Sequence, residues 1–416
     1  MAQSVARRLG KAEVGGSSPL DSFVIFIKRT ERRAFRGIGL RKAFFLPLPT
    51  KRRDAVGSGG SGFTKEDSMC LKGIAIWLMM FHHCFMSEER FEGYAVDFAP
   101  FSQQFVVDVC GYFKICVPIF VFITGYGLYM SAKGRCTDAR STERWIGARS
   151  VKTLSGFWAV YVLVFATTQV FAGYPSGIYL EKGWISGAVY MLLDLLGLAQ
   201  LSGTPTLVAT WWYMSAAVVY IILVPVFVKW TGKLGYATLF CSIVVLPRCV
   251  GEGYPGGTNL FTFLPALALG MLFAQYGVFE KLDRLKGEWI QFIVYHVLLV
   301  ASVAVWIKIP MHQLWEYHVG PATLIGICYC RKYVMRIPVI REGLIFCGRH
   351  SMDIFLIHSF IRTIFFEEFI YGFGHFALIV LVLFAVSLGL SIVIGALERW
   401  SGYDKYVDVL CKKIMG

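Results

Sequence analysis

A series of long apolar runs, which begins at residue 70, constrains this chain more than any other feature. A helix needs about 20 predominantly apolar residues to cross the hydrocarbon core of a bilayer. Runs of that length predict an all-α, polytopic integral membrane protein. Ten spans are expected, near residues 70–87, 112–130, 152–172, 208–229, 235–249, 259–277, 289–307, 319–334, 343–363 and 374–397.

Composition supports a membrane protein and excludes two other classes. Hydrophobic residues make up 56% of the chain and charged residues 16%, whereas about 25% charged residues is usual for soluble domains. A soluble domain of this size could not bury so much apolar surface, and the composition is the opposite of that of disordered chains. Most of the eleven cysteines lie in or beside apolar runs, without paired Cys/His clusters, so we expect no metal site.

The positive charge of the chain is concentrated at its N-terminus. Residues 1–65 hold fourteen Lys/Arg against four Asp/Glu and include the Gly/Ser-rich stretch 56–62, whereas the whole chain has a net charge of +14. We expect residues 1–65 to be a disordered basic extension, or the product of a start codon placed too early. A genuine basic cytoplasmic tail is the alternative. The other cations sit between apolar runs, so nucleic acid is not an expected partner.

Loop charge predicts the topology. An eleventh apolar segment, 184–200, is short, interrupted by glycine and contains Asp194. Without it, a cytoplasmic N-terminus places eighteen Lys and Arg residues on the inner side and six on the outer side. Counting it as a span would invert the later loops and oppose the positive-inside rule. We therefore expect both termini in the cytoplasm, 401–416 as a short cytoplasmic tail, and 184–200 at the outer interface or re-entrant.

Few ionisable residues lie within the apolar runs, and at membrane depth such groups are functional-site candidates. Lys72 and His83 are eleven residues apart on the first span. Eleven residues turn a helix about 20° past three full turns and rise roughly 16 Å, so both side chains share one face. On the ninth span His358 has a depth similar to that of His83, and Asp353 lies between this level and the cytoplasmic end.

These residue types suit acyl transfer. Imidazole is a natural general base near neutral pH and could take the proton of a sugar hydroxyl that attacks an acyl carbonyl. Trp212, near the outer end of the fourth span, suits the face of a sugar ring. Basic residues on the inner side, namely Lys72, Arg149, Lys152 and Arg349, suit the phosphates of a donor that arrives from the cytoplasm.

Each of these residues also has a purely structural interpretation. Lys72 could extend to the inner headgroups. The aromatic cluster that contains Trp212 could belong to an interfacial belt, and Arg149 and Lys152 could only determine topology.

Five stretches resemble the membrane acyltransferase 3 family, whose members are bacterial O-acyltransferases of surface polysaccharides, and they occur in the order of the family. The resemblance covers about residues 66–400 and makes this region the membrane acyltransferase domain. The stretches are LKGIAIWLMMFHH (71–83), PIFVFITGYGL (118–128), ERWIGARSVK (143–152), TWWYMSAAVVYIILVP (210–225) and GRHSMDIFLIHSFI (348–361).

The resemblance implies that His83 is catalytic and that Lys72 is its basic partner. Two positions depart from the usual pattern. Lys72 stands where many members have arginine, which weakens bidentate recognition of phosphate. Thr124 stands where the family usually has serine before Gly125, and this change keeps a hydroxyl.

The expected function is O-acylation at the cell (plasma or inner) membrane. An acyl group, in the simplest case acetyl, would pass from cytoplasmic acyl-CoA (acetyl-CoA) to a hydroxyl of a cell-surface glycan or glycolipid. His83 and Lys72 are the predicted catalytic residues. The donor would be held by Arg149, Lys152 and Arg349, and the acceptor by His358, Trp212 and Asp353.

Besides donor and acceptor, the expected partners are membrane lipid and other glycan-assembly proteins. Two alternatives stay open at this point. A transporter or flippase of a lipid-linked sugar would use the same polar residues as a pathway, although no internal repeat is evident. A scaffold of an envelope assembly would need Lys72 and His83 for stability alone.

Overall fold

The computed structural model describes residues 62–240, 262–309 and 315–416, and within these ranges the chain is helical. The only β pairing there is an isolated bridge between Asp97 and His375. Six helical segments of this part are long and apolar enough to cross a membrane. They are α3 (Lys65–Phe85), α4 (Gln103–Tyr112) continued by α5 (Cys116–Ala132), α6 (Ala139–Ala172), Ala209–Gly232 in α10 (Trp212–Phe240) and the turn before it, α14 (Glu288–Lys308) and α20 (Phe376–Ser401).

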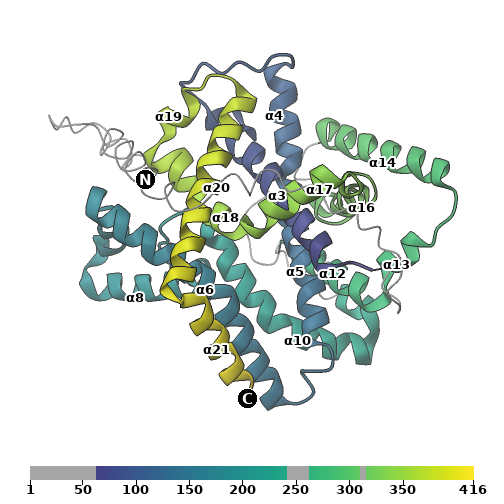
Figure 1. Cartoon of the computed structure of the whole chain (residues 1–416), viewed down its shortest axis with the longest axis horizontal. Helices are drawn as coiled ribbons and strands as arrows, with labels where there is room; N and C mark the ends of the chain where they lie inside the picture. Colours follow the sequence, from purple (N-terminus) through teal and green to yellow (C-terminus); the bar gives the residue numbers. More distant parts are fainter. Residues whose placement is uncertain (1–61, 241–261, 310–314) are drawn as a thin grey trace. The chain divides into compact units, whose positions relative to one another are not determined.

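Shorter helices fill the intervals between these segments (Figure 1). In chain order they are α7 (Tyr174–Tyr179), α8 (Trp184–Leu195), α9 (Ala199–Ser202), α12 (Leu264–Tyr276), α13 (Val278–Asp283), α15 (Trp315–Tyr317), α16 (Thr323–Lys332), α17 (Pro338–Arg349), α18 (Ser351–Ser359), α19 (Glu367–Tyr371) and α21 (Tyr403–Met415). Two π-helical segments, His318–Ala322 and Phe360–Phe365, precede α16 and follow α18.

The expected all-α membrane architecture is confirmed, whereas the number of ten spans stays a prediction. The expected span 343–363 is a bent pair, in which α17 meets Ser351–Phe365 at 62°. The expected span 259–277 corresponds to α12, which has 13 residues. The expected span 235–249 falls largely outside the described residues, as do residues 1–61 of the N-terminal extension. Helix α8 of the segment 184–200 has 12 residues and is too short to cross by itself.

Local sequence determines where α3 and α6 begin. Thr64 accepts a hydrogen bond from the Asp67 backbone N–H at 3.1 Å, and the Thr64 N–H donates to the Asp67 carboxylate at 2.9 Å. Asp138 and Ser141 form the same reciprocal cap at the start of α6. Such capping boxes satisfy two backbone donors that have no partner within the helix. Helix α3, which carries Lys72 and His83, therefore has a sharply defined start.

Glycines allow two pairs of helices to approach closely. A Cβ atom at Gly73 of α3 would overlap the backbone carbonyl of Leu344 in α17, and one at Gly348 would overlap that of Met69. Gly125 of α5 and Gly270 of α12 make the same kind of contact with each other's helix. Small residues at crossings are typical of membrane helices, because packing has to replace the hydrophobic driving force. These crossings bring α17, and with it α18, against α3.

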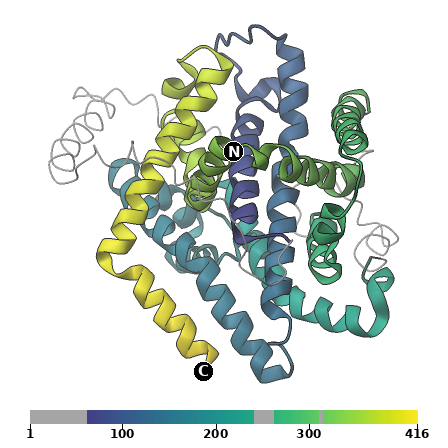
Figure 2. The ribbon, with the colours of Figure 1, turned by 45° about the vertical axis from the view of Figure 1, so that its right-hand side comes forward.

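The segment expected as a short tail, 401–416, is mostly the helix α21. Gly402 ends α20 with a positive φ of 73°, and Figure 2 shows that the two helices meet at an angle there. Helix α21 packs along α6, where the Lys152 ammonium lies 2.8 Å from the Asp408 carboxylate. The Cys411 thiol also donates to the Ala148 carbonyl at 3.6 Å. The C-terminal residues thus belong to the packed structure.

Candidate active site

Two imidazoles from distant parts of the chain meet at the end of α3. The ring centroids of His83 in α3 and His358 in α18 are 4.9 Å apart, and the ring planes are inclined at 49°. Helix α18 reaches α3 through the bend that follows α17. The similar depth expected from the sequence is therefore realised as a direct ring contact.

The immediate environment of His83 differs from that of the preceding histidine. The His82 ring is 5% exposed, and its Nδ1 atom lies 2.9 Å from the Cys110 carbonyl, so it is held to α4. His83 is partly accessible, and its buried Nδ1 atom has no hydrogen-bond partner among the described residues. Because no protein group holds Nδ1, the tautomer of His83 is not fixed by the protein, which suits a ring that gains and loses a proton.

His358 is fixed in one tautomer. Its Nδ1 atom lies 2.8 Å from the Phe355 carbonyl and 3.2 Å from that of Ile354. Because carbonyl oxygens only accept, Nδ1 carries the hydrogen and Nε2 is the acceptor. The Ser359 hydroxyl lies 3.1 Å from Nε2 and donates to it, and Thr210 at the start of the fourth span lies 3.4 Å from Ser359. His358 is therefore a rigid, fully buried neighbour of His83.

Lys72 lies three helical turns before His83 on the same helix, about 16 Å away along the axis. Its side chain is partly buried, and it makes no ion pair or hydrogen bond with the described residues. A buried ammonium without a carboxylate partner is expensive at membrane depth. An anionic ligand would supply the missing counter-charge.

Among the aromatic residues of TWWYMSA, Trp212 is not the one that touches α18. Trp212 stacks on Phe263, with ring centroids 5.6 Å apart. Trp211 donates its indole N–H to the Leu356 carbonyl at 3.0 Å. Tyr213 packs edge-on against Phe355, with ring centroids 5.7 Å apart. The role of Trp212 in acceptor binding stays a prediction.

Asp353 belongs to a polar contact between α18 and α20. The Ser391 hydroxyl donates to Asp353 Oδ2 at 2.6 Å, and His350 Nδ1 lies 2.9 Å from the same hydroxyl. Because the single hydroxyl hydrogen goes to the carboxylate, His350 donates to Ser391 and does not act on it as a base. Asp353 precedes His358 by five residues, which places it about 140° around the helix. Its predicted part in the acceptor site is untested.

The three cations predicted to hold the donor have separate surroundings. Arg149 donates to the Ser131 hydroxyl and lies 5.9 Å from the centroid of the Trp145 ring. Lys152 pairs with Asp408, as described above. Arg349 is exposed at the end of α17. No described contact joins any of them to Lys72 or His83, so their role as a donor site stays a prediction.

The family of the chain is decided by comparison with known domains. The model of the acyltransferase domain of the acyltransferase 3 family matches residues 68–396. The chain belongs to the acyltransferase 3 family. Comparison with curated proteins and with solved structures gives no significant match.

Membership of this family establishes that the chain is an enzyme, an acyltransferase. Its long apolar helices agree with a membrane protein. The matched region starts at α3 and ends in α20, and therefore includes both His83 and His358. The pair that the structure brings together thus lies inside the family domain.

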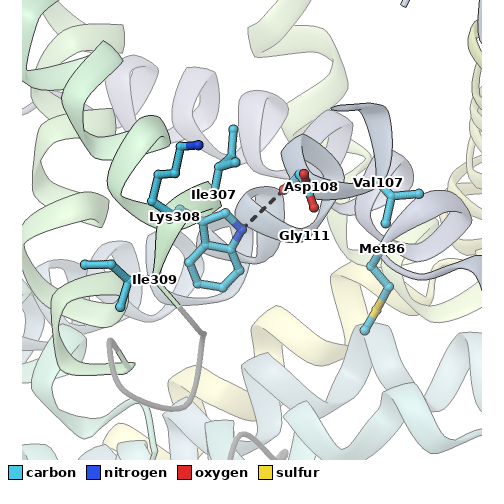
Figure 3. Close-up of a pocket in the computed structure, with 8 residues that line it drawn as sticks. Met86, Val107, Asp108, Gly111, Ile307, Lys308 and Ile309 are labelled. Atoms are coloured by element: carbon cyan, nitrogen blue, oxygen red, sulfur yellow. Dashed lines mark hydrogen bonds between the residues drawn. The ribbon is translucent and has the colours of Figure 1, made fainter. Parts of the chain in front are cut away.

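A hollow of about 340 Å³ opens beside the end of α3. Figure 3 shows it between Met86, Asp108 and Gly111 on one side and residues 307–309 on the other. The Trp306 indole N–H donates to the Asp108 carbonyl across it, at 3.2 Å. None of its lining residues belongs to the predicted site, although Met86 is only three residues after His83.

The sequence analysis of the acyltransferase overlooked one buried cation beside the histidine pair. Arg362 lies in the π-helical segment Phe360–Phe365 and is 2% exposed. The sequence spacing could have predicted this position, because a residue four positions after His358 lies on the same helix face.

Proposed function

We propose that this acyltransferase moves an acyl group, in the simplest case acetyl, from cytoplasmic acyl-CoA to a hydroxyl of a cell-surface glycan or glycolipid. The observation that carries the proposal is the His83–His358 contact at 4.9 Å, with the buried Nδ1 of His83 unpartnered among the described residues. This contact supports the assignment of His83 as a proton acceptor in an enzyme of the acyltransferase 3 family. His83 would be the general base.

In the proposed reaction, His83 removes the proton of the acceptor hydroxyl while that oxygen attacks the acyl carbon of the thioester. The tetrahedral intermediate collapses by cleavage of its carbon–sulfur bond. The leaving thiolate takes the proton back from the imidazolium, so an O-acyl ester and the CoA thiol are the products. His358, fixed by its hydrogen bonds, keeps the His83 ring in place.

The spacing of Lys72 and His83 suits a donor of the CoA type. The two groups share one helix face and are separated by roughly 16 Å of helix rise. In CoA, a long pantetheine arm separates the charged phosphates from the reactive thioester. Lys72 would bind the phosphates, with Arg149 and Arg349 nearer the cytoplasm, while the thioester reaches His83. The direction of approach follows from the positive-inside topology, with both termini in the cytoplasm.

The proposal is tested by mass spectrometry of surface glycans from cells that express the chain or a variant of it. We expect the wild-type chain to add the mass of an acyl group and His83→Ala to add none. Lys72→Gln should lower acylation in these cells. In a kinetic assay of the purified chain, it should raise the KM for acetyl-CoA more than it lowers kcat. His296→Ala is the matched control, because this histidine of α14 is bound to the Phe292 carbonyl and the Tyr329 hydroxyl and has no described contact with His83.

Equal amounts of each variant in the membrane make the comparison valid. Acylation that persists at the wild-type level in His83→Ala would refute the proposed base. The absence of any acyl difference between cells with and without the chain would refute the glycan acceptor.

A further inference from the structure

The two permanent charges that act on the His83 ring are both positive and belong to Arg362 and Arg90. The neighbouring His358 ring accepts a hydrogen bond at Nε2 and is neutral. No carboxylate of the described residues is among the charged groups that act on His83. The tetrahedral intermediate of acyl transfer carries one negative oxygen, which a single cation can stabilise. The excess of cations therefore calls for a separate explanation.

Arg362 is the most deeply buried of these cations. Its guanidinium donates from Nη1 to the Tyr371 hydroxyl at 3.3 Å, and this hydroxyl donates to the Cys84 carbonyl at 3.2 Å. The bridge fixes Arg362 against the α3 residue that follows His83. The Nε atom of Arg362 is buried and has no hydrogen-bond partner among the described residues. The residue also lies in a π-helical segment, a distortion that is frequent at functional sites.

Arg90 approaches the same region from the turn after α3. Burial, followed by the nearby Arg362 cation, lowers the pKa of Arg90. Its Nη2 atom donates to the Met86 sulfur at 3.7 Å, which is a weak contact for a guanidinium. Neither Arg90 nor Arg362 forms an ion pair with a carboxylate in the described ranges. Two neighbouring guanidinium groups thus lie in the protein without a direct ion pair among the described residues, although Glu89 is close enough to act on Arg90.

Burial of like charges without a counter-ion is unfavourable, and groups in such environments cluster at functional sites, where a ligand can supply the opposite charge. Guanidinium groups match the planar, bidentate geometry of carboxylate and phosphate. We infer that Arg362 and Arg90 bind a carboxylate or phosphate group of the acceptor, next to the hydroxyl that His83 activates. This inference rests on the proposed function and adds the chemical class of the acceptor.

The position of the two arginines assigns the anion to the acceptor and not to the donor. They surround the His83 end of α3, whereas the phosphates of CoA are placed near Lys72, about 16 Å away along the helix. Met86, which contacts Arg90, also lines the hollow of Figure 3. This hollow therefore opens next to one of the two arginines.

The inference is tested by ligand binding to the purified full chain in lipid nanodiscs, without acyl transfer. Thermal stabilisation is measured with matched probes, namely glucuronate against glucose and farnesyl phosphate against farnesol. The first pair represents a sugar acid and the second a lipid-linked phosphate. We expect the anionic member of at least one pair to stabilise the wild-type chain at a concentration about 10- to 100-fold lower than its neutral counterpart.

Variants link this preference to the two arginines. Arg362→Gln and Arg90→Gln should remove it, Arg362→Lys should retain part of it, and the exposed Arg140→Gln should leave it unchanged. Arg362→Lys also covers the case in which Arg362→Gln does not fold. Equal stabilisation by the anionic and neutral probes, or a preference that survives in Arg362→Gln, would overturn the inference. Loss of stabilisation by acetyl-CoA in Arg362→Gln would also overturn it, because the arginines would then belong to the donor site.

The binding experiment can succeed or fail independently of the proposed acyl-transfer reaction. Acyl transfer by the wild-type chain without any preference for anions would refute the inference alone. A preference for anions that depends on Arg362, in a chain that transfers no acyl group to a glycan, would refute the proposed function and leave the anion site in place.

Discussion

At the scale of single residues, hydrogen-bond partners distinguish two residues, His83 and Asp353, that the sequence analysis had both treated as site candidates. His83 has a buried nitrogen without a described partner, whereas Asp353 is bound to Ser391, which also contacts His350. Both were candidates because they are ionisable residues in apolar runs. The partners of Asp353 predict a mainly structural contribution, and those of His83 predict a chemical one.

Ser391→Ala tests the structural contribution. The change removes the hydroxyl that donates to Asp353, and an unsatisfied buried partner costs about 1–3 kcal/mol. We expect a lower thermal unfolding midpoint and an unchanged acyl-transfer rate per folded molecule. Ser387→Ala, one turn earlier on α20, is the matched control, because the buried Ser387 hydroxyl has no partner among the described residues. Equal destabilisation by both variants would contradict the role of the Asp353 contact.

At the scale of helices, a glycine contact allows α5 and α12 to cross closely. Gly125 of α5 fits against the Leu267 carbonyl of α12, and Gly127, two residues later, has nothing within 4 Å of a hypothetical Cβ. The sequence analysis noted Gly125 because it follows Thr124 in a family motif. The structure adds a packing reason for a small residue at this position.

Gly125→Ala is expected to destabilise the protein by about 1–3 kcal/mol, because a methyl group has to push two backbones apart. Gly127→Ala should be neutral or slightly stabilising, since alanine favours helix over glycine. Thermal unfolding of both variants in the same detergent measures the difference. Similar midpoints would show that the α5–α12 crossing is not limited by side-chain size.

An ion pair joins α13 to α16 and makes the stability of the folded protein depend on pH. Both terminal nitrogens of Arg331 lie 2.7 Å from the carboxylate oxygens of Asp283, and these bonds lower the pKa of Asp283. Its stabilising effect is therefore complete above the pKa of the unfolded state and is lost as pH falls through the lower folded pKa. Because the Asp283 side chain is 37% exposed, the pair contributes about 1 kcal/mol or less.

Asp283→Asn should therefore unfold at a lower temperature than the wild-type chain at pH 7. The difference between them should shrink as pH falls below about 4, where the wild-type carboxylate also becomes neutral. A difference that stays constant from neutral to acidic pH would contradict the pairing.

At the scale of the whole molecule, the proposed topology depends on the distribution of Lys and Arg. A C-terminal fluorescent protein should be bright and a C-terminal alkaline phosphatase inactive, because the C-terminus is expected in the cytoplasm. The same reporters inserted at Gly93, in the turn region after α3, should give the opposite result. Active phosphatase at the C-terminus would reverse the orientation and with it the side from which acyl-CoA approaches.

The sequence by itself determined the properties that depend on spacing along one helix. Apolar length predicted helices within a membrane, and eleven residues placed Lys72 and His83 on one face, because the helix repeat is fixed by the backbone. The order of the short motifs predicted the family that the domain comparison shows.

Only the tertiary structure decided which helices touch and what each side chain contacts. It brought His358 to His83, turned Asp353 towards α20, and gave Trp211 rather than Trp212 the contact with α18. It also revealed Arg362 beside the pair. These contacts depend on close crossings and on a 62° bend between α17 and α18. Such features arise from the fit of backbones and side chains between separate helices, which a periodic pattern along one segment does not encode.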